Sequence, residues 1–164
     1  MPSRRLLLVR HATAAAGSVD ADRPLTAGGA RQAAAIGSWL EQAGVVPDRV
    51  LASPALRARQ TWELTGLPLE PIVDPRIYDN TVEDLLTAIQ ETPDDVRTVA
   101  VVGHNPSIGE LSAVLDGGEG DPEARRAVDR GFPAGGVAVF GLPGSFAALV
   151  PGAATLSDFA VPGD

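Results

Sequence analysis

Two histidines and two arginines are the residues of this sequence best suited to chemistry. His11 and His104 are the only histidines in 164 residues, and each follows an apolar run, in the stretches LLLVRH and VAVVGH. Arg10 adjoins the first histidine, and Arg57 ends the segment SPALR. A neutral imidazole can attack an electrophile, and a guanidinium group binds the oxygens of phosphate or carboxylate. Together these residues predict a site that binds an anion beside two imidazoles.

The composition excludes several other kinds of active site. The sequence has no cysteine, and all 13 of its basic residues are arginine. It therefore lacks a thiolate nucleophile, a cysteine zinc site, a Schiff-base lysine and the lysine of a P-loop. The formal charge of -8 argues against nucleic acid or an anionic membrane as a partner, because both bind extended positive surfaces. An anionic substrate would depend on a local cluster of arginines.

The amino terminus contains the stretch SRRLLL, which resembles a twin-arginine export signal. The apolar run 6–9 is only four residues long before Arg10 interrupts it, whereas a signal core needs about 7 to 15 apolar residues. No run approaches the length of a membrane span. We therefore expect a cytoplasmic protein.

Alternating strands and helices are expected to position the four residues. The run 5–9 has no periodicity, which is typical of a strand buried on both faces of a parallel sheet. Two helices should begin at a polar residue followed by proline, at Ser53 and at Asn105. The expected strands are 5–9, 49–52, 70–74 and 97–103, and the helices that follow them start at Thr26, Ser53, Thr81 and Asn105. This order predicts one domain over residues 1–164, a three-layer α/β/α sandwich with a mostly parallel central sheet.

The last third of the chain has a weaker pattern. Residues 116–136 are polar and rich in glycine, which indicates a mobile loop or lid with one helical turn or none. We expect its arginines, at positions 125, 126 and 130, to be solvated. Residues 136–142 and 145–150 flank a Pro-Gly pair and favour a β-hairpin, and residues 154–161 favour a further edge strand.

Both histidines should lie at the same edge of the sheet. Parallel strands bring their carboxyl ends to one side, where ligands bind in open α/β sheets, so His11 and His104 are expected to share a pocket. Helices that begin near Pro54 and Pro106 would direct unpaired backbone N–H groups toward it. With the two arginines, this arrangement suits a phosphoryl group. Taken singly, each residue is more often structural, so the prediction depends on their convergence.

Four stretches occur in order along the chain: LVRHATA, DADRPLTAGGARQA, LASPALRARQTWEL and VAVVGHNPSIGEL. They resemble the sequence blocks of the histidine phosphatase superfamily, also called the phosphoglycerate-mutase-like fold, and especially its small SixA-type branch of phosphohistidine phosphatases. The resemblance implies a hydrolase in which His11 is the nucleophile and becomes transiently phosphorylated. It also implies that Arg10, Arg57 and His104 complete the phosphate pocket, with Asn105 as a further substrate-binding residue. No metal or organic cofactor is implied.

A general acid for the leaving group is harder to assign. Asp79, beside Tyr78, and Asp20 are the candidates, although a carboxylate near a loop is more often a solvated surface group. An alkoxide leaving group gains much from an acid, whereas an imidazole leaves readily once it is protonated near neutral pH. A missing acid therefore favours a phosphoramidate substrate such as phosphohistidine.

Two other functions stay open at this point. The chain could be a phosphomonoesterase for a small molecule such as a sugar phosphate or a cofactor precursor. It could also be a non-catalytic module that uses the pocket only to bind phosphate, in which case no covalent intermediate would form. The expected partner is accordingly a phosphorylated protein or a small phosphorylated substrate.

Overall fold

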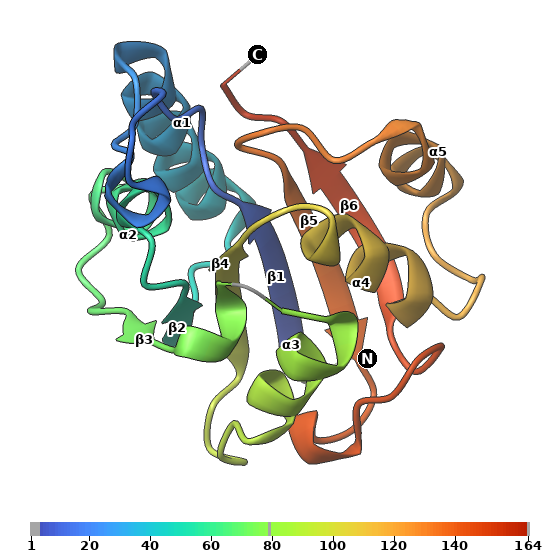
Figure 1. The fold of residues 1–164 in the computed structure, drawn as a ribbon. Coiled ribbons are helices and arrows are strands. Elements are labelled where there is room, and N and C mark those ends of the chain that lie inside the picture. Colours follow the sequence, from blue (N-terminus) through green and yellow to red (C-terminus); the bar gives the residue numbers. More distant parts are fainter. Residues whose placement is uncertain (1–3, 79, 164) are drawn as a thin grey trace.

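The apolar runs of the sequence form the strands of one six-stranded sheet (Figure 1). The computed structural model describes residues 4–78 and 80–163. The strands lie in the order β3-β2-β4-β1-β5-β6. They are β1 (Arg4–Arg10), β2 (Arg49–Ala52), β3 (Ile72–Val73), β4 (Thr98–Gly103), β5 (Val137–Leu142) and β6 (Thr155–Ala160). The helices are α1 (Ala27–Ala43), α2 (Leu56–Glu63), α3 (Val82–Gln90), α4 (Ser107–Leu115) and α5 (Pro122–Arg130).

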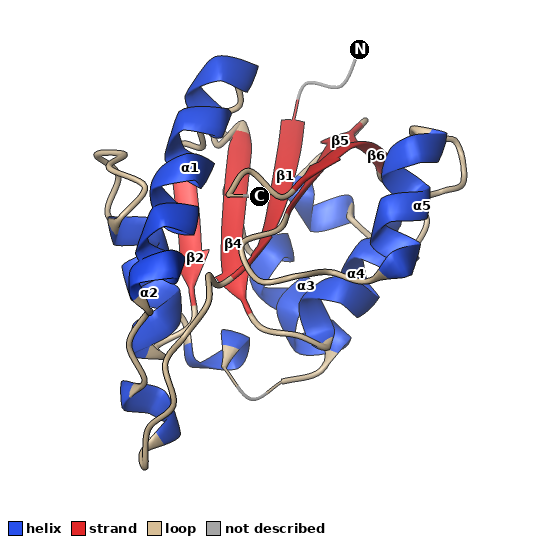
Figure 2. Ribbon diagram, turned by 90° about the horizontal axis from the view of Figure 1, so that it is seen from above, coloured by secondary structure: helices blue, strands red, loops and turns tan. Residues whose placement is uncertain are grey.

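Helices cover both faces of the sheet, as the view from above shows (Figure 2). Two apolar clusters fill the two interfaces. Leu7 and Val9 of β1 belong to the cluster beneath α1 and α2, and Leu6 and Leu8 belong to the cluster beneath α3, α4 and α5. This arrangement confirms the predicted α/β/α sandwich, because a central strand with apolar residues on both sides needs a helical layer on each face. None of the described helices is long and apolar enough to cross a membrane.

The register between β1 and β4 brings the two histidines together. The strands are parallel neighbours, and Arg10 is paired with Gly103 in the ladder. His11 and His104 each follow that last pair by one residue, so both leave the sheet at the same point. The four strands β1 to β4 are mutually parallel, whereas β5 and β6 run antiparallel to their neighbours. The predicted parallel arrangement therefore applies to the part of the sheet that carries the histidines.

The start of α2 differs from the prediction. The helix begins at Leu56, and Ala55 rather than Ser53 occupies the cap position, without a side-chain hydrogen bond. The Ser53 hydroxyl accepts a hydrogen bond from the N–H of Ala55 at 3.1 Å, so it stabilises a turn that precedes the helix. Because the hydroxyl of Ser53 does not cap α2, it can also contact a side chain from another element.

The start of α4 is displaced in the same way. The helix begins at Ser107 with Pro106 at the cap position. The side chain of Asn105 nevertheless contacts the first turn, because its Oδ1 accepts from the N–H of Gly109 at 3.1 Å. The helix starts predicted at Thr26 and Thr81 are confirmed by α1 and α3, and each threonine caps its helix by accepting a backbone N–H.

The prediction of a loop over residues 116–136 is wrong, because this segment contains the nine-residue helix α5. Asp121 caps the helix by accepting from the N–H of Ala124 at 2.9 Å, and proline follows at the first helical position. Ala124 and Val128 lie one turn apart and are buried in the core. Arg125 is not simply solvated, since it forms an ion pair with the buried Asp116. Because α5 buries only two apolar residues, its sequence shows no clear helical period from which the helix could be predicted.

The predicted hairpin is also wrong. Strand β5 pairs with β6, and residues 146–148 form a short 3-10 helix instead of a strand. Phe146 is fully buried in the core, and the hydroxyl of Ser145 accepts from the N–H of Ala148 to start the helical turn. The prediction of an edge strand within 154–161 is confirmed by β6.

Candidate active site

A pocket of about 430 Å³ opens where β1 and β4 end, and we call it the histidine pocket. It is lined by Arg10, His11, Asp20, Arg23, Arg57, Tyr78, His104 and Asn105. The structure therefore brings together all the described residues that the sequence analysis assigned to the site. Asp79, the other candidate for a general acid, lies outside the described residues.

Hydrogen bonds to the backbone fix His11 at the end of β1. Its N–H donates to the carbonyl oxygen of Gly103 at 3.0 Å. Its ring Nδ1 lies 2.7 Å from the carbonyl oxygen of Ala12. Because a carbonyl group only accepts, Nδ1 carries the proton in this contact and Nε2 keeps a lone pair. The imidazole therefore has one nitrogen available for nucleophilic attack.

The segment after His11 is held by two helices. The buried hydroxyl of Thr61 in α2 accepts from the N–H of Ala12 at 2.9 Å and donates to the carbonyl oxygen of Arg57 at 2.7 Å. In α1, a Cβ on Gly29 would lie 2.1 Å from the carbonyl oxygen of Thr13, so the helix can approach only with glycine there. Neither contact was predicted, since each joins segments far apart in the sequence.

His104 lies beside His11, with the two ring centroids 5.1 Å apart. Its Nε2 is 2.8 Å from the hydroxyl oxygen of Ser53, and both side chains are buried. Because Ser53 is itself fixed by the N–H of Ala55, this hydrogen bond sets the orientation of the His104 ring. Ser53 followed by proline has the pattern of a helix cap, so its contact with His104 was not predicted.

The two arginines reach the histidine pocket from different elements. Nη1 of Arg10 donates to the carbonyl oxygen of Phe132 at 3.0 Å, and its buried Nε has no hydrogen-bond partner within residues 4–78 and 80–163. Arg57 is only 6% exposed and donates to Asp20 twice, to the backbone carbonyl oxygen at 2.8 Å and to Oδ2 at 3.0 Å. Two guanidinium groups that line one pocket favour the binding of an anion.

Asp20 lies in the histidine pocket as predicted, but its contacts are those of an ionised carboxylate. It accepts hydrogen bonds from the hydroxyl of Tyr78 and from the guanidinium groups of Arg23 and Arg57. These contacts, that of Tyr78 most strongly, hold the pKa of Asp20 well below its usual range. A lowered pKa disfavours the protonated form that a general acid needs. The carboxylate instead connects two arginines and a tyrosine, and neither Arg23 nor Tyr78 was predicted as a site residue.

Both histidines are neutral at physiological pH. Burial is the main reason that the pKa of His11 falls from 6.5 to about 4, and the positive charges of Arg57 and Arg10 lower it further. Burial also lowers the pKa of His104 to about 3, with the charges of His11 and Arg57 acting in the same direction. A neutral imidazole keeps its lone pair, so His11 can attack an electrophile without first losing a proton.

The pH titration of the two imidazoles should reveal these lowered pKa values. With only two histidines in the chain, their C2 protons give two resonances in an NMR spectrum, and His11→Ala identifies one of them. We expect neither signal to shift between pH 8 and about pH 5.5, because the folded pKa values are about 4 and 3. A midpoint near 6.5 for either resonance would contradict this description of the pocket.

The same shifts predict how stability depends on pH. Both folded pKa values lie below the ordinary value of 6.5, so the unfolded chain binds more protons as the pH falls below that value. The contribution of the two histidines to stability is therefore complete above about pH 6.5 and declines as the pH falls toward 4. His11→Ala should flatten part of this decline in a series of thermal unfolding measurements.

Sequence and structure comparisons show what the chain is similar to. A family model described as the histidine phosphatase superfamily (branch 1) matches residues 6–95. Phosphohistidine phosphatase SixA of Escherichia coli K12 is 35% identical over 125 residues, which cover 72% of this chain and 78% of that protein. The solved structure of protein histidine phosphatase SixA with tungstate superposes with a TM-score of 0.78 at 30% identity, over 96% of this chain and 97% of that chain. A protein of Nakamurella multipartitia proposed to be SixA gives a TM-score of 0.86 at 35% identity, over 99% of both chains.

Proposed function

Because the chain belongs to the histidine phosphatase superfamily, we propose that it hydrolyses phosphohistidine through a covalent intermediate on His11. The expectation of a phosphatase of the SixA type is confirmed by the family model and by the relative from Escherichia coli. The observation that carries the role of His11 is its neutral imidazole beside Arg10 and Arg57, with Nδ1 bonded to a carbonyl group and Nε2 without a hydrogen-bond partner among the described residues.

The reaction proceeds in two displacements at phosphorus. In the first, Nε2 of His11 attacks the phosphorus atom, and the bond between phosphorus and the nitrogen of the leaving imidazole breaks. The leaving imidazole carries a proton on its other ring nitrogen, so it takes the electron pair of the broken bond and departs as a neutral imidazole. In the second, water attacks the phosphorus, inorganic phosphate leaves, and the electron pair returns to Nε2.

Three side chains stabilise the phosphoryl group during this transfer. The charge of a transferring phosphoryl is spread over three oxygens, and Arg10 and Arg57 supply N–H donors and positive charge toward them. His104 is neutral and oriented by Ser53, so it binds the same group by hydrogen bonding rather than by charge. Protein histidine phosphatase SixA binds tungstate, a tetrahedral oxyanion like phosphate, which supports an oxyanion site in this chain as well.

We propose phosphohistidine rather than a phosphate ester as the substrate because of the carboxylic acid in the histidine pocket. Among the described residues that line the histidine pocket, Asp20 is the one carboxylic acid, and its pKa is lowered. Departure of an alkoxide would need a proton from such a group, whereas a protonated imidazole is already a good leaving group. The phosphohistidine phosphatase activity named for the relative from Escherichia coli supports the same choice.

A comparison of two substrates tests this proposal. We expect kcat/KM for an acetylated phosphohistidine to exceed that for an alkyl phosphate by at least about 100-fold, since Asp20, the one acid among the described lining residues, is ionised and general acid catalysis contributes about 10²- to 10⁴-fold. The variant Asp20→Asn should lower both rates by a similar factor, because Asp20 positions Arg57 and donates no proton. Faster hydrolysis of the alkyl phosphate would show that the protein is a phosphomonoesterase instead. A selective loss of that activity in Asp20→Asn would show that Asp20 acts as its general acid.

A further inference from the structure

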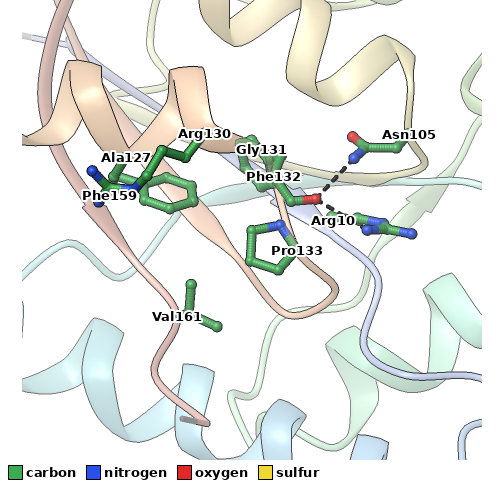
Figure 3. Close-up of a pocket in the computed structure, with 9 residues that line it drawn as sticks. All are labelled: Arg10, Asn105, Ala127, Arg130, Gly131, Phe132, Pro133, Phe159 and Val161. Atoms are coloured by element: carbon green, nitrogen blue, oxygen red, sulfur yellow. Dashed lines mark hydrogen bonds between the residues drawn. The ribbon is translucent and has the colours of Figure 1, made fainter.

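A second hollow adjoins the histidine pocket, and it has a different chemistry (Figure 3). It measures about 710 Å³ and lies between α5, the segment that follows α5, and the end of β6. We call it the Phe132 hollow. Arg10 and Asn105 line both cavities, so the Phe132 hollow begins next to the place where a ligand of His11 would bind.

The wall shared by the two cavities is held by one carbonyl group. The carbonyl oxygen of Phe132 accepts from Nη1 of Arg10 at 3.0 Å and from Nδ2 of Asn105 at 2.8 Å, as the dashed lines in Figure 3 show. The N–H of Gly135 also bonds to the carbonyl oxygens of Arg10 and His11. These hydrogen bonds fix the segment after α5 relative to His11. The Phe132 hollow therefore lies at a fixed distance from the His11 ring.

The lining of the Phe132 hollow is largely apolar. The ring of Phe132 is buried and packs edge-on against Phe159, with their centroids 5.0 Å apart. Pro133 and Val161 add further apolar surface (Figure 3). The charged side chain on the α5 side is Arg130, which is exposed and forms no ion pair among the residues that the structure describes. An apolar surface next to one unpaired cation favours a ligand with an apolar group and a nearby carboxylate.

We infer that the Phe132 hollow binds the polypeptide that carries the phosphohistidine, and that it receives an apolar side chain close to that residue, with an acidic residue opposite Arg130. This inference rests on the proposed function. The phosphoryl group and its imidazole occupy the polar histidine pocket, which leaves the second hollow without a role for free phosphohistidine. A volume of about 710 Å³ lies within the range of whole ligand sites, so it can accept side chains of a neighbouring segment.

Three phosphohistidine substrates test the inference. The first is acetylated phosphohistidine, the second a peptide with leucine and glutamate near the phosphohistidine on both sides, and the third the same peptide with serine at those positions. We expect kcat/KM for the leucine and glutamate peptide to exceed that for the serine peptide by about tenfold, the value of one buried apolar side chain. The difference should appear mainly in KM, because the hollow does not touch the reacting atoms.

Variants of the hollow provide the control. Val161→Asp places a charge in the apolar lining and should reduce the ratio between the two peptides to near one. A fourth peptide carries lysine in place of glutamate, and Arg130→Glu should reverse the preference of the wild type for the glutamate peptide over this lysine peptide. Val150→Asp introduces the same charge at an exposed valine outside the hollow and should leave the ratio unchanged. Because each ratio is measured within one variant, a change in the folded fraction cancels.

The outcomes separate this inference from the proposed function. The inference would be overturned by equal kcat/KM values for both peptides in the wild type, or by a preference that survives in Val161→Asp. Activity on acetylated phosphohistidine would still uphold the proposed function in either case. Inactivity toward all three substrates would overturn both.

Discussion

His11→Ala should lower the turnover of phosphohistidine by at least about a thousandfold, the loss typical for a missing nucleophile. His104 is not expected to replace it, because its Nε2 is bonded to Ser53 and, in the proposed mechanism, its other ring nitrogen donates to the phosphoryl group. Steady-state release of inorganic phosphate measures the effect. The backbone N–H of residue 11 still donates to Gly103 in the variant, so the thermal unfolding temperature should change little.

The variant His104→Ala gives a matched comparison for His11→Ala. It removes the neighbouring imidazole, which in the proposed mechanism binds the phosphoryl group but does not attack it, so it should retain the covalent intermediate at a reduced rate. Turnover by His11→Ala within tenfold of the wild type would contradict the role of His11 as nucleophile.

Arg57→Ala should lower kcat/KM by about 10²- to 10³-fold, as expected for the loss of one donor that stabilises developing charge. Arg57→Lys should recover only part of this loss, because an ammonium group cannot bind two oxygens as a planar fork does. The side chain is nearly buried and pairs with Asp20, so stability must be followed as well. Thermal unfolding of Arg57→Ala and of Arg57→Ala with Asp20→Asn shows how much of the loss of stability comes from the broken ion pair with Asp20.

Arg57→Lys tests whether the positive charge of Arg57 or the planar geometry of its guanidinium group matters for activity. Full activity of Arg57→Lys would show that a positive charge alone suffices at this position. Activity of Arg57→Ala within tenfold of the wild type would contradict a role for Arg57 in phosphoryl transfer.

The centre of the site could be predicted because local sequence determines it. Continuous apolar runs identify β1 and β4 as buried parallel strands, and parallel neighbours carry the residues that follow them to one edge. The pattern of the two runs is therefore enough to predict that His11 and His104 share a pocket. Arg57 joins them because it lies in the first turn of the helix after β2.

The contacts that tune the site could not be predicted in the same way. Asp20 reaches Arg57 only because residues 14–25 fold back over α2, where the N–H of Leu25 donates to Gln60 at 2.8 Å. Ser53 followed by proline has the pattern of a helix cap, yet its hydroxyl bonds to His104 across 51 positions of the chain. Such long-range pairs leave no periodicity in a single sequence.

The errors in the last third of the chain have a similar cause. Strand β5 pairs with β6 and not with the apolar stretch nearest to it, because Phe146 and Leu149 are buried in the core next to the sheet. Helix α5 depends on packing against β6 and α4, which the charged sequence of the helix does not reveal. Since α5 forms one side of the Phe132 hollow, the sequence pattern gives no indication of the substrate preference inferred above.

The covalent intermediate on His11 is tested most directly by the mass of the intact protein. Wild type and His11→Ala are each mixed with acetylated phosphohistidine, quenched within milliseconds at alkaline pH, where phosphohistidine survives, and measured by mass spectrometry. We expect one added phosphoryl group on the wild type and none on His11→Ala, with the adduct disappearing as inorganic phosphate is released. An adduct of equal occupancy on both proteins, or phosphate release by the wild type without any adduct at any quench time, would contradict a phosphorylated His11.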